Sequence, residues 1–178
     1  MQSVCEVLEQ MVADGVVTSY AIGGATAAGF HGEPLATRDI DVFVSLDVAE
    51  GSLLIGLEPV FQWFAAKGFS DFDEEGLLVC GFPVQFLPAS TPIEREAVEQ
   101  AILIEWEGIR MRVMRPEHLA AIALSVGRPK DRARVVYLCA LPDFDRSRFA
   151  DILNLHQLSD RWQEWSTGLG LDPKLPPG

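Results

Sequence analysis

Apolar and polar residues alternate along the chain with two periods, one typical of helices and one of strands. Residues 5–15 repeat apolar positions at helical spacing and end on a glycine, which predicts an opening helix. Residues 18–22 and 39–46 are rich in β-branched and aromatic residues and predict two strands. Between them, the double glycine Gly23-Gly24 and the small residues after it predict a turn followed by a helix.

The rest of the chain continues this mixed pattern. Residues 76–88 predict two short strands joined near Gly81 and Phe82, and residues 102–114 predict a hairpin that turns at Glu107 and Gly108. Helices are predicted at 59–68, 92–101, 116–127, 130–141, 145–156 and 159–168. The sequence therefore predicts an α/β (α+β) fold, in which a small mixed β-sheet flanked by helices spans residues 1–115. A helical C-terminal part over residues 116–178 is expected to pack on this sheet unit or beside it.

Composition narrows the class of protein. A chain of 178 residues, of which 48% are hydrophobic and 22% charged, is typical of a soluble globular protein. No apolar run approaches the length of a membrane span, and the N-terminal segment is acidic where a signal peptide would be basic. We therefore expect a cytoplasmic protein that makes no membrane contact. The isolated cysteines Cys5, Cys80 and Cys139 have no zinc or redox spacing and are predicted to be buried thiols.

The charge is distributed unevenly. The formal net charge of −12 argues against a protein that coats nucleic acid non-specifically. Residues 1–107 hold 3 of the 14 Lys and Arg residues against 18 acidic residues, whereas residues 108–134 hold 7 basic residues against 2 acidic ones. Two interpretations follow from charge alone. The basic segment either covers the solvent face of a strand and the ends of helices, or anchors phosphates.

Asp39 and Asp41 stand one residue apart in a predicted strand. Side chains alternate between the faces of a strand, so the two carboxylates share one face, with Ile40 and Val42 on the opposite, core side. Two neighbouring carboxylates repel unless a cation lies between them. Mg²⁺ (or Mn²⁺) suits such a pair, because a hard divalent ion takes oxygen ligands and leaves positions for substrate phosphates.

The glycine turn stands about 15 residues before the aspartate pair. A glycine turn between a strand and a helix lets backbone N–H groups approach an anion closely. A double glycine alone predicts only a turn, and an aspartate pair alone also occurs on exposed edge strands. The combination in this order is more specific than either motif and predicts a phosphate-and-metal site.

The sequence resembles the nucleotidyltransferase superfamily with the DNA polymerase β type fold in two motifs, IGGATAAGFHG and TRDIDVFV. It is most similar to the small bacterial AbiEii-like branch and other minimal nucleotidyltransferases. The resemblance implies that Gly23 and Gly24 contact a nucleoside triphosphate, and that Asp39 and Asp41 are the catalytic, metal-binding residues. It further implies transfer of a nucleoside monophosphate to a hydroxyl, with RNA or a protein as the expected acceptor and an antitoxin as an expected partner.

One position departs from the pattern of the superfamily. A third carboxylate is expected on a neighbouring strand, and the best-placed residue there is Gln85, a weak magnesium ligand and a poor base. Either another acid serves, such as Glu105 or Asp131, or the protein is a degenerate module that keeps a nucleotide or metal site and transfers nothing.

The stretch GRPKDRAR, residues 127–134, also has two interpretations. On the first, its charges cap a helix and face solvent, as Asp131 suits a first helical turn. The resemblance instead implies that the start of this helix faces the cleft, where Arg128 and Lys130 would bind the triphosphate or the backbone of an acceptor nucleic acid.

Overall fold

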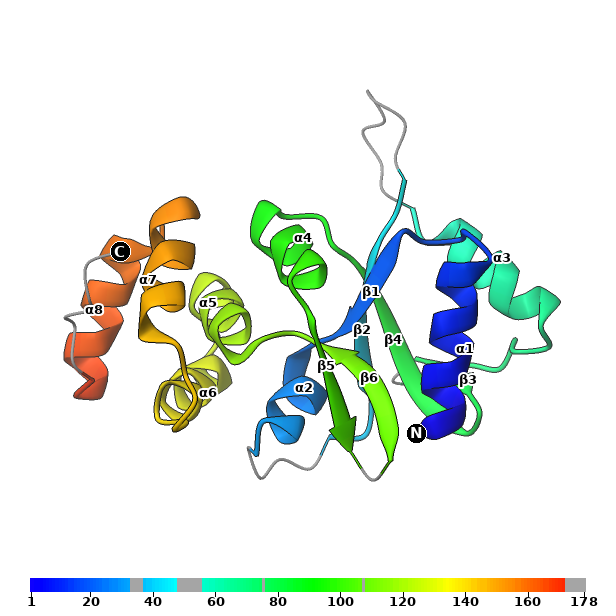
Figure 1. Cartoon of the computed structure of the whole chain (residues 1–178), viewed down its shortest axis with the longest axis horizontal. Coiled ribbons are helices and arrows are strands. Elements are labelled where there is room, and N and C mark those ends of the chain that lie inside the picture. Colours follow the sequence, from blue (N-terminus) through cyan, green and yellow to red (C-terminus); the bar gives the residue numbers. More distant parts are fainter. Residues whose placement is uncertain (33–36, 48–55, 75, 107, 172–178) are drawn as a thin grey trace.

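The computed structural model describes residues 1–32, 37–47, 56–74, 76–106 and 108–171, and shows a six-stranded mixed sheet flanked by helices (Figure 1). The strands are β1 (Ser19–Ile22), β2 (Ile40–Ser45), β3 (Leu77–Val79), β4 (Phe82–Pro88), β5 (Ile102–Trp106) and β6 (Ile109–Val113). The helices are α1 (Gln2–Ala13), α2 (Gly24–Phe30), α3 (Glu58–Ala66), α4 (Pro92–Glu99), α5 (Pro116–Val126), α6 (Pro129–Cys139), α7 (Arg146–Leu155) and α8 (Ser159–Leu169). The predicted fold class is confirmed.

The sheet has the strand order β3-β4-β2-β1-β6-β5. Two hairpins, β3–β4 and β5–β6, form its edges, while β1 pairs antiparallel with β2 and parallel with β6 in the middle. Strand β2 also pairs in parallel with β4, which places Asp41 opposite Gln85. The two sequence-distant hairpins are thus joined through β2 and β1.

The two faces of the sheet pack against different helices. Figure 1 shows α1 and α3 on one side of the sheet, and α2 and α4 towards the C-terminal helices. On the α3 side, the rings of Phe64 and Phe86 lie 4.9 Å apart between centroids. Ile40 and Val42 are 4% and 0% exposed, so the predicted inward face of β2 is confirmed.

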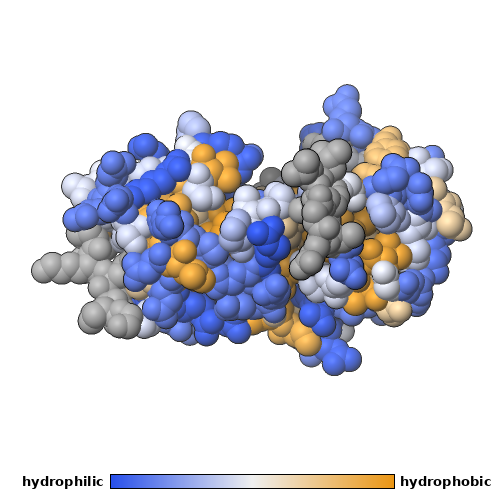
Figure 2. Space-filling model, turned by 90° about the horizontal axis from the view of Figure 1, so that it is seen from above, coloured by the Kyte–Doolittle hydropathy of each residue, from blue (hydrophilic) through white to orange (hydrophobic). Residues whose placement is uncertain are grey.

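The last four helices gather at one end of the molecule (Figure 1), and the surface is notched near its middle when the molecule is seen from above (Figure 2). Helix α5 begins at Pro116, where the predicted C-terminal part begins, and packs on α4 and α2. The division into two domains stays a prediction. No described helix combines the length and the apolar character that crossing a bilayer requires.

Two local predictions differ from the structure. Helix α1 begins at Gln2, three residues earlier than the apolar spacing indicates, and ends before Gly15, which has a φ of +71°. Cys80 is exposed, whereas Cys5 and Cys139 are buried as predicted. The reason is the β3–β4 turn, where Cys80 and Gly81 both have positive φ angles, as in the two-residue turns that match strand twist. The predicted turn residue Glu107 lies outside the described residues.

Candidate functional site

A cleft of about 780 Å³ lies where the sheet meets the C-terminal helices. Residues of β2, β4, α4, α5 and α6 line it, together with the start of α2. Five of the six predicted site residues are among the lining residues: Gly24, Asp39, Asp41, Arg128 and Lys130. The sixth, Gly23, is the N-cap of α2, immediately before Gly24. The folded chain therefore gathers the predicted site residues around one cleft.

The glycine turn is in direct contact with the strand that carries the aspartates. The Gly23 N–H donates to the carbonyl oxygen of Asp41 over 2.9 Å, and a Cβ on Gly23 would lie 2.7 Å from the ring of Phe43. Gly24 has a φ of +55°, and a Cβ there would overlap with Oδ2 of Asp41. Any larger residue at position 24 would displace that carboxylate, so the two motifs are parts of one structure.

Asp41 lies half-buried on the cleft face of β2. Burial, followed by the negative charge of Asp39, raises the pKa of Asp41 above its ordinary value. The backbone N–H of Ala25 and the positive charges of Arg134 and Lys130 act in the opposite direction and only partly compensate. The pair is therefore a place where a cation would relieve an existing electrostatic cost.

Asp39 lies just before β2 begins and is held by two threonines. Thr37 Oγ1 donates to Asp39 Oδ1 over 2.7 Å, and Thr26 Oγ1 donates to the Asp39 backbone carbonyl over 2.8 Å. Thr37 of the TRDID motif therefore fixes the direction of the Asp39 carboxylate. Hydrogen bonds of this kind, from Ser or Thr to a residue two positions away, are a recognisable local signal.

Gln85 occupies the position beside Asp41. The parallel register of β2 and β4 pairs these two residues, and the exposed Gln85 lines the cleft. The strand pairing thus places Gln85 beside Asp41, at the position where the sequence analysis expects a third carboxylate. At this point of the sheet the site offers a neutral amide, which can donate and accept hydrogen bonds but is a poor base.

The two replacement acids considered from sequence do not fill this role. Glu105 lies on β5, which β1 and β6 separate from β2, and it pairs with Arg110 rather than facing the cleft. The sequence could not reveal this, because it does not show the order of the strands. Asp131 does line the cleft, but its carboxylate is completely buried and engaged by Arg128.

The start of α6 fits both interpretations of GRPKDRAR. Asp131 Oδ2 accepts from the Arg128 backbone N–H and from Nε, both over 2.9 Å, and Oδ1 accepts from Nη2 over 3.1 Å. Burial alone would raise the pKa of Asp131, but these hydrogen bonds outweigh it and leave the pKa below its ordinary value. The capping interpretation is confirmed. Arg128 and Lys130 nevertheless also line the cleft, and each interacts electrostatically with Asp41.

Arg134 is a cleft residue that the sequence reasoning missed. It follows Lys130 by four residues, and residues at this spacing share one face of a helix. The four-residue spacing between Lys130 and Arg134 is the sequence signal that could have identified Arg134 as a cleft residue. Glu94 was missed as well, but its Oε2 accepts from the Thr91 N–H over 2.9 Å as part of the capping box of α4, so its first role is structural.

The other basic residues of the segment 108–134 lie elsewhere. Arg110 and Arg112 line a separate hollow between α1 and the β5–β6 hairpin. Arg112 forms an ion pair with Glu9 at 3.6 Å, which supports the solvent-face interpretation for these two arginines. Within the basic segment, Arg128, Lys130 and Arg134 thus line the cleft, whereas Arg110 and Arg112 of β6 do not.

The carboxylates that the cleft offers suit a hard divalent cation. Within the described ranges, no group of three or more His, Cys, Asp and Glu side chains could hold a metal ion. The pair Asp39 and Asp41 therefore offers two carboxylates, and an ion there would need further ligands from water and substrate. Mg²⁺ is commonly bound in this way, through one or two carboxylates and substrate phosphates.

Comparison with known proteins gives a likeness of fold. No protein-family model and no curated protein sequence matches this chain. The crystal structure of an antigenic nucleotidyltransferase-like protein from Paracoccidioides brasiliensis aligns with it at a TM-score of 0.54 and 15% identity, over 96% of this chain and 92% of that one. The solution structure of the antibiotic-resistance factor ANT(2'')-Ia aligns at a TM-score of 0.46 and 13% identity, over 94% and 98%. The first alignment shows that the chain has the fold of a nucleotidyltransferase-like protein. The AbiEii-like branch stays a prediction.

Proposed function

We propose that the chain is a Mg²⁺- or Mn²⁺-dependent nucleotidyltransferase, which moves a nucleoside monophosphate from a nucleoside triphosphate to an acceptor hydroxyl. One observation carries the proposal: the glycine turn contacts the aspartate-bearing strand and faces the cations of α6 across a single cleft. The fold shared with a nucleotidyltransferase-like protein supports it. RNA or a protein as acceptor, and an antitoxin as partner, belong to the same proposal.

In this proposal each part of the cleft has a defined task. Asp39 and Asp41 would hold the metal ion, with Thr37 fixing Asp39 and the Ala25 N–H fixing Asp41. Gly24 presents backbone without a side chain, so that phosphates can approach the cleft wall. A metal ion held there would neutralise charge on the attacking and leaving oxygens of an in-line displacement.

The cations of α6 bind the other side of the triphosphate. Lys130 supplies a mobile ammonium group, and Arg128 supplies a guanidinium that Asp131 already holds in place. The acceptor oxygen bonds to the α-phosphorus while the bond to pyrophosphate breaks. The hydroxyl proton must pass to a base, and Gln85 cannot take it.

The position of Gln85 favours a second candidate function. A module that binds a metal–nucleotide complex without transferring it needs the carboxylate pair and the α6 cations but no base on β4. The two candidates make the same prediction for binding and opposite predictions for transfer.

Binding is tested by calorimetry with each of the four nucleoside triphosphates, with and without Mg²⁺. We expect Mg²⁺-enhanced binding in the wild type and its loss in the double variant Asp39→Asn with Asp41→Asn. Asp47→Asn is the matched control, because Asp47 is an exposed acid just after β2 and is not a cleft residue. Absence of Mg²⁺-enhanced binding for all four nucleotides would refute both candidate functions.

Transfer is tested by incubating the protein with labelled triphosphates and total RNA, and with total protein in a parallel reaction. Label transfer that the double variant abolishes supports the enzyme. Binding without transfer supports the module, and then Gln85→Glu, which restores a carboxylate opposite Asp41, is the variant in which transfer is expected to appear.

A further inference from the structure

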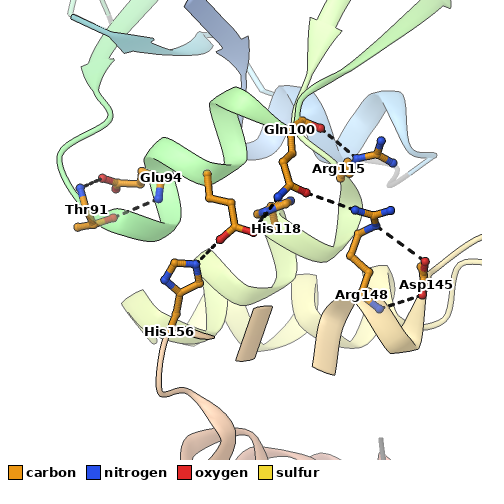
Figure 3. A network of polar contacts seen from close by, with 9 residues as sticks. Thr91, Glu94, Gln100, Arg115, His118, Asp145, Arg148 and His156 are labelled. Carbon is orange, nitrogen blue, oxygen red and sulfur yellow. Dashed lines mark hydrogen bonds and ion pairs between the residues drawn. The ribbon is translucent and has the colours of Figure 1, made fainter. Parts of the chain in front are cut away.

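A cluster of titratable side chains lies at the junction between the sheet half and the C-terminal helices, outside the cleft. Its centre is Glu96 of α4, which contacts His156 Nε2 through Oε2 and lies 3.5 Å from His118 Nε2 through Oε1. His118 belongs to α5 and His156 is the C-cap of α7 (Figure 3). The Glu96 carboxylate therefore lies against two imidazoles, one from α5 and one from the end of α7.

Neighbouring hydrogen bonds join the same three helices (Figure 3). Arg115 Nε donates to the Gln100 carbonyl over 3.0 Å, and Arg148 Nη1 donates to Gln100 Oε1 over 3.3 Å. Between α5 and α7, Glu117 Oε1 accepts from the Asp145 N–H over 2.8 Å. These residues and the imidazole–carboxylate cluster together form a joint, in which α4 is fastened to α5 and α7.

The environment of His118 disfavours its charged form. Its side chain is completely buried, and neither ring nitrogen makes a hydrogen bond in the described part of the protein. Burial lowers the pKa of His118, and the nearby Arg148 and Arg115 lower it further, while only Glu96 acts in the opposite direction. Helices α2 and α6 also pack on α5, but neither contributes a charge among those that act most strongly on this imidazole.

The charge balance of the joint limits how many protons it can hold. One imidazolium can be neutralised by the single carboxylate of Glu96. A second imidazolium would leave a net positive charge in a buried place beside Arg115 and Arg148, and burying an unpaired charge is strongly unfavourable.

We propose that this joint is a pH-sensitive latch, in which protonation of both imidazoles on Glu96 at mildly acidic pH releases α5 and α7 from α4. The release changes the cleft, because α4 contributes Glu94 to one wall and α5 contributes Leu119 and Ile122 to another. Glu94 stands two residues from Glu96, and Leu119 follows His118 directly. The latch is independent of whether the cleft binds a nucleotide.

The direction of the pH effect follows from linkage. The unfolded or released His118 takes up a proton near pH 6.5, whereas the buried one does so at lower pH. The contribution of His118 to a closed joint is therefore complete above that pH and is lost as the pH falls towards the folded-state pKa. Within this window, one group reduces the closing equilibrium constant by up to about tenfold per pH unit.

The first test is a titration of the wild-type imidazoles by NMR between pH 4.5 and 8. The chain has three histidines, so the variants His31→Gln and His156→Gln assign the signals. We expect His118 to titrate below the ordinary value of about 6.5. A His118 signal that titrates at or above that value would overturn the proposal, and this measurement needs no variant of His118 to fold.

The second test is hydrogen exchange, expressed as protection factors at pH 7.5 and pH 5.0. We expect the amides of α4, α5 and α7 to lose protection at pH 5.0, by up to about tenfold per pH unit below 6.5, while β1 and β2 keep theirs. His118→Gln should remove this difference. His31→Gln should retain it, because His31 contacts the Met114 carbonyl rather than Glu96. Equal pH dependence in His118→Gln and the wild type, or a loss of protection spread over the whole sheet, would overturn the latch.

Discussion

The contact between Gly24 and Asp41 gives a sharp prediction for two alanine substitutions in one helix. At Gly24 the φ of +55° alone costs a non-glycine residue about 1–2 kcal/mol, and the added Cβ would also overlap with Oδ2 of Asp41. At Gly29, in the same helix, no atom lies within 4 Å of an added Cβ and φ is not positive. Ala there should stabilise the helix by about 0.5–1 kcal/mol.

The two variants should therefore differ in unfolding free energy by roughly 2–3 kcal/mol, with opposite signs relative to the wild type. Urea denaturation measures this difference, and in a chain of this size it corresponds to a gap of roughly 4–12 °C in melting temperature. Gly24→Ala should in addition lose Mg²⁺-enhanced nucleotide binding, whereas Gly29→Ala should keep it. If both variants gain or lose stability equally, the close packing of the glycine turn on Asp41 is refuted.

Three further predictions concern single side chains. Because burial and Asp39 raise the pKa of Asp41, ionised Asp41 destabilises the metal-free fold at neutral pH, so Asp41→Asn should raise the melting temperature at pH 7. This gain should shrink as the pH falls through the raised pKa, and added Mg²⁺ should no longer stabilise the variant. Thr91→Ala removes the N-cap of α4 and should cost about 1 kcal/mol of unfolding free energy in urea denaturation, whereas an unchanged midpoint would contradict the cap. A thiol reagent should modify only the exposed Cys80 in the native protein, since burial raises the pKa of the Cys139 thiol to about 12; rapid modification of a second cysteine would contradict this burial.

Much of the fold could be predicted because local patterns determine it. The alternation around Asp41 identified β2 and its buried face, and the glycines at positions 15 and 127 marked the ends of α1 and α5. The sequence pattern predicts too late a start for α1, because the first residues of this helix carry few apolar side chains. The sequence predicts the β3–β4 turn at Gly81 and Phe82, whereas the structure has it one residue earlier, at Cys80 and Gly81, and this shift is what exposes Cys80.

The candidate site was predictable only where its parts are close in sequence. The glycine turn and the aspartate pair lie in adjacent elements, so their contact could be anticipated. The exclusion of Glu105 needed the strand order, and the convergence of His118 and His156 on Glu96 needed the packing of three helices. These are tertiary relationships, for which a single sequence has no periodic signal.

The position of β1 in the sheet has a consequence for how the chain folds. Its antiparallel partner β2 follows β1 within a short stretch of chain. Its parallel partner β6 lies about 90 residues after β1 in the sequence, with Ile22 paired to Val113. Closing such a long loop costs more conformational entropy than closing a hairpin, and long-range pairing slows folding. We therefore expect the β3-β4-β2-β1 portion to form before the β5–β6 hairpin docks on β1. The helices after β6 would then add to a sheet that only this late step completes.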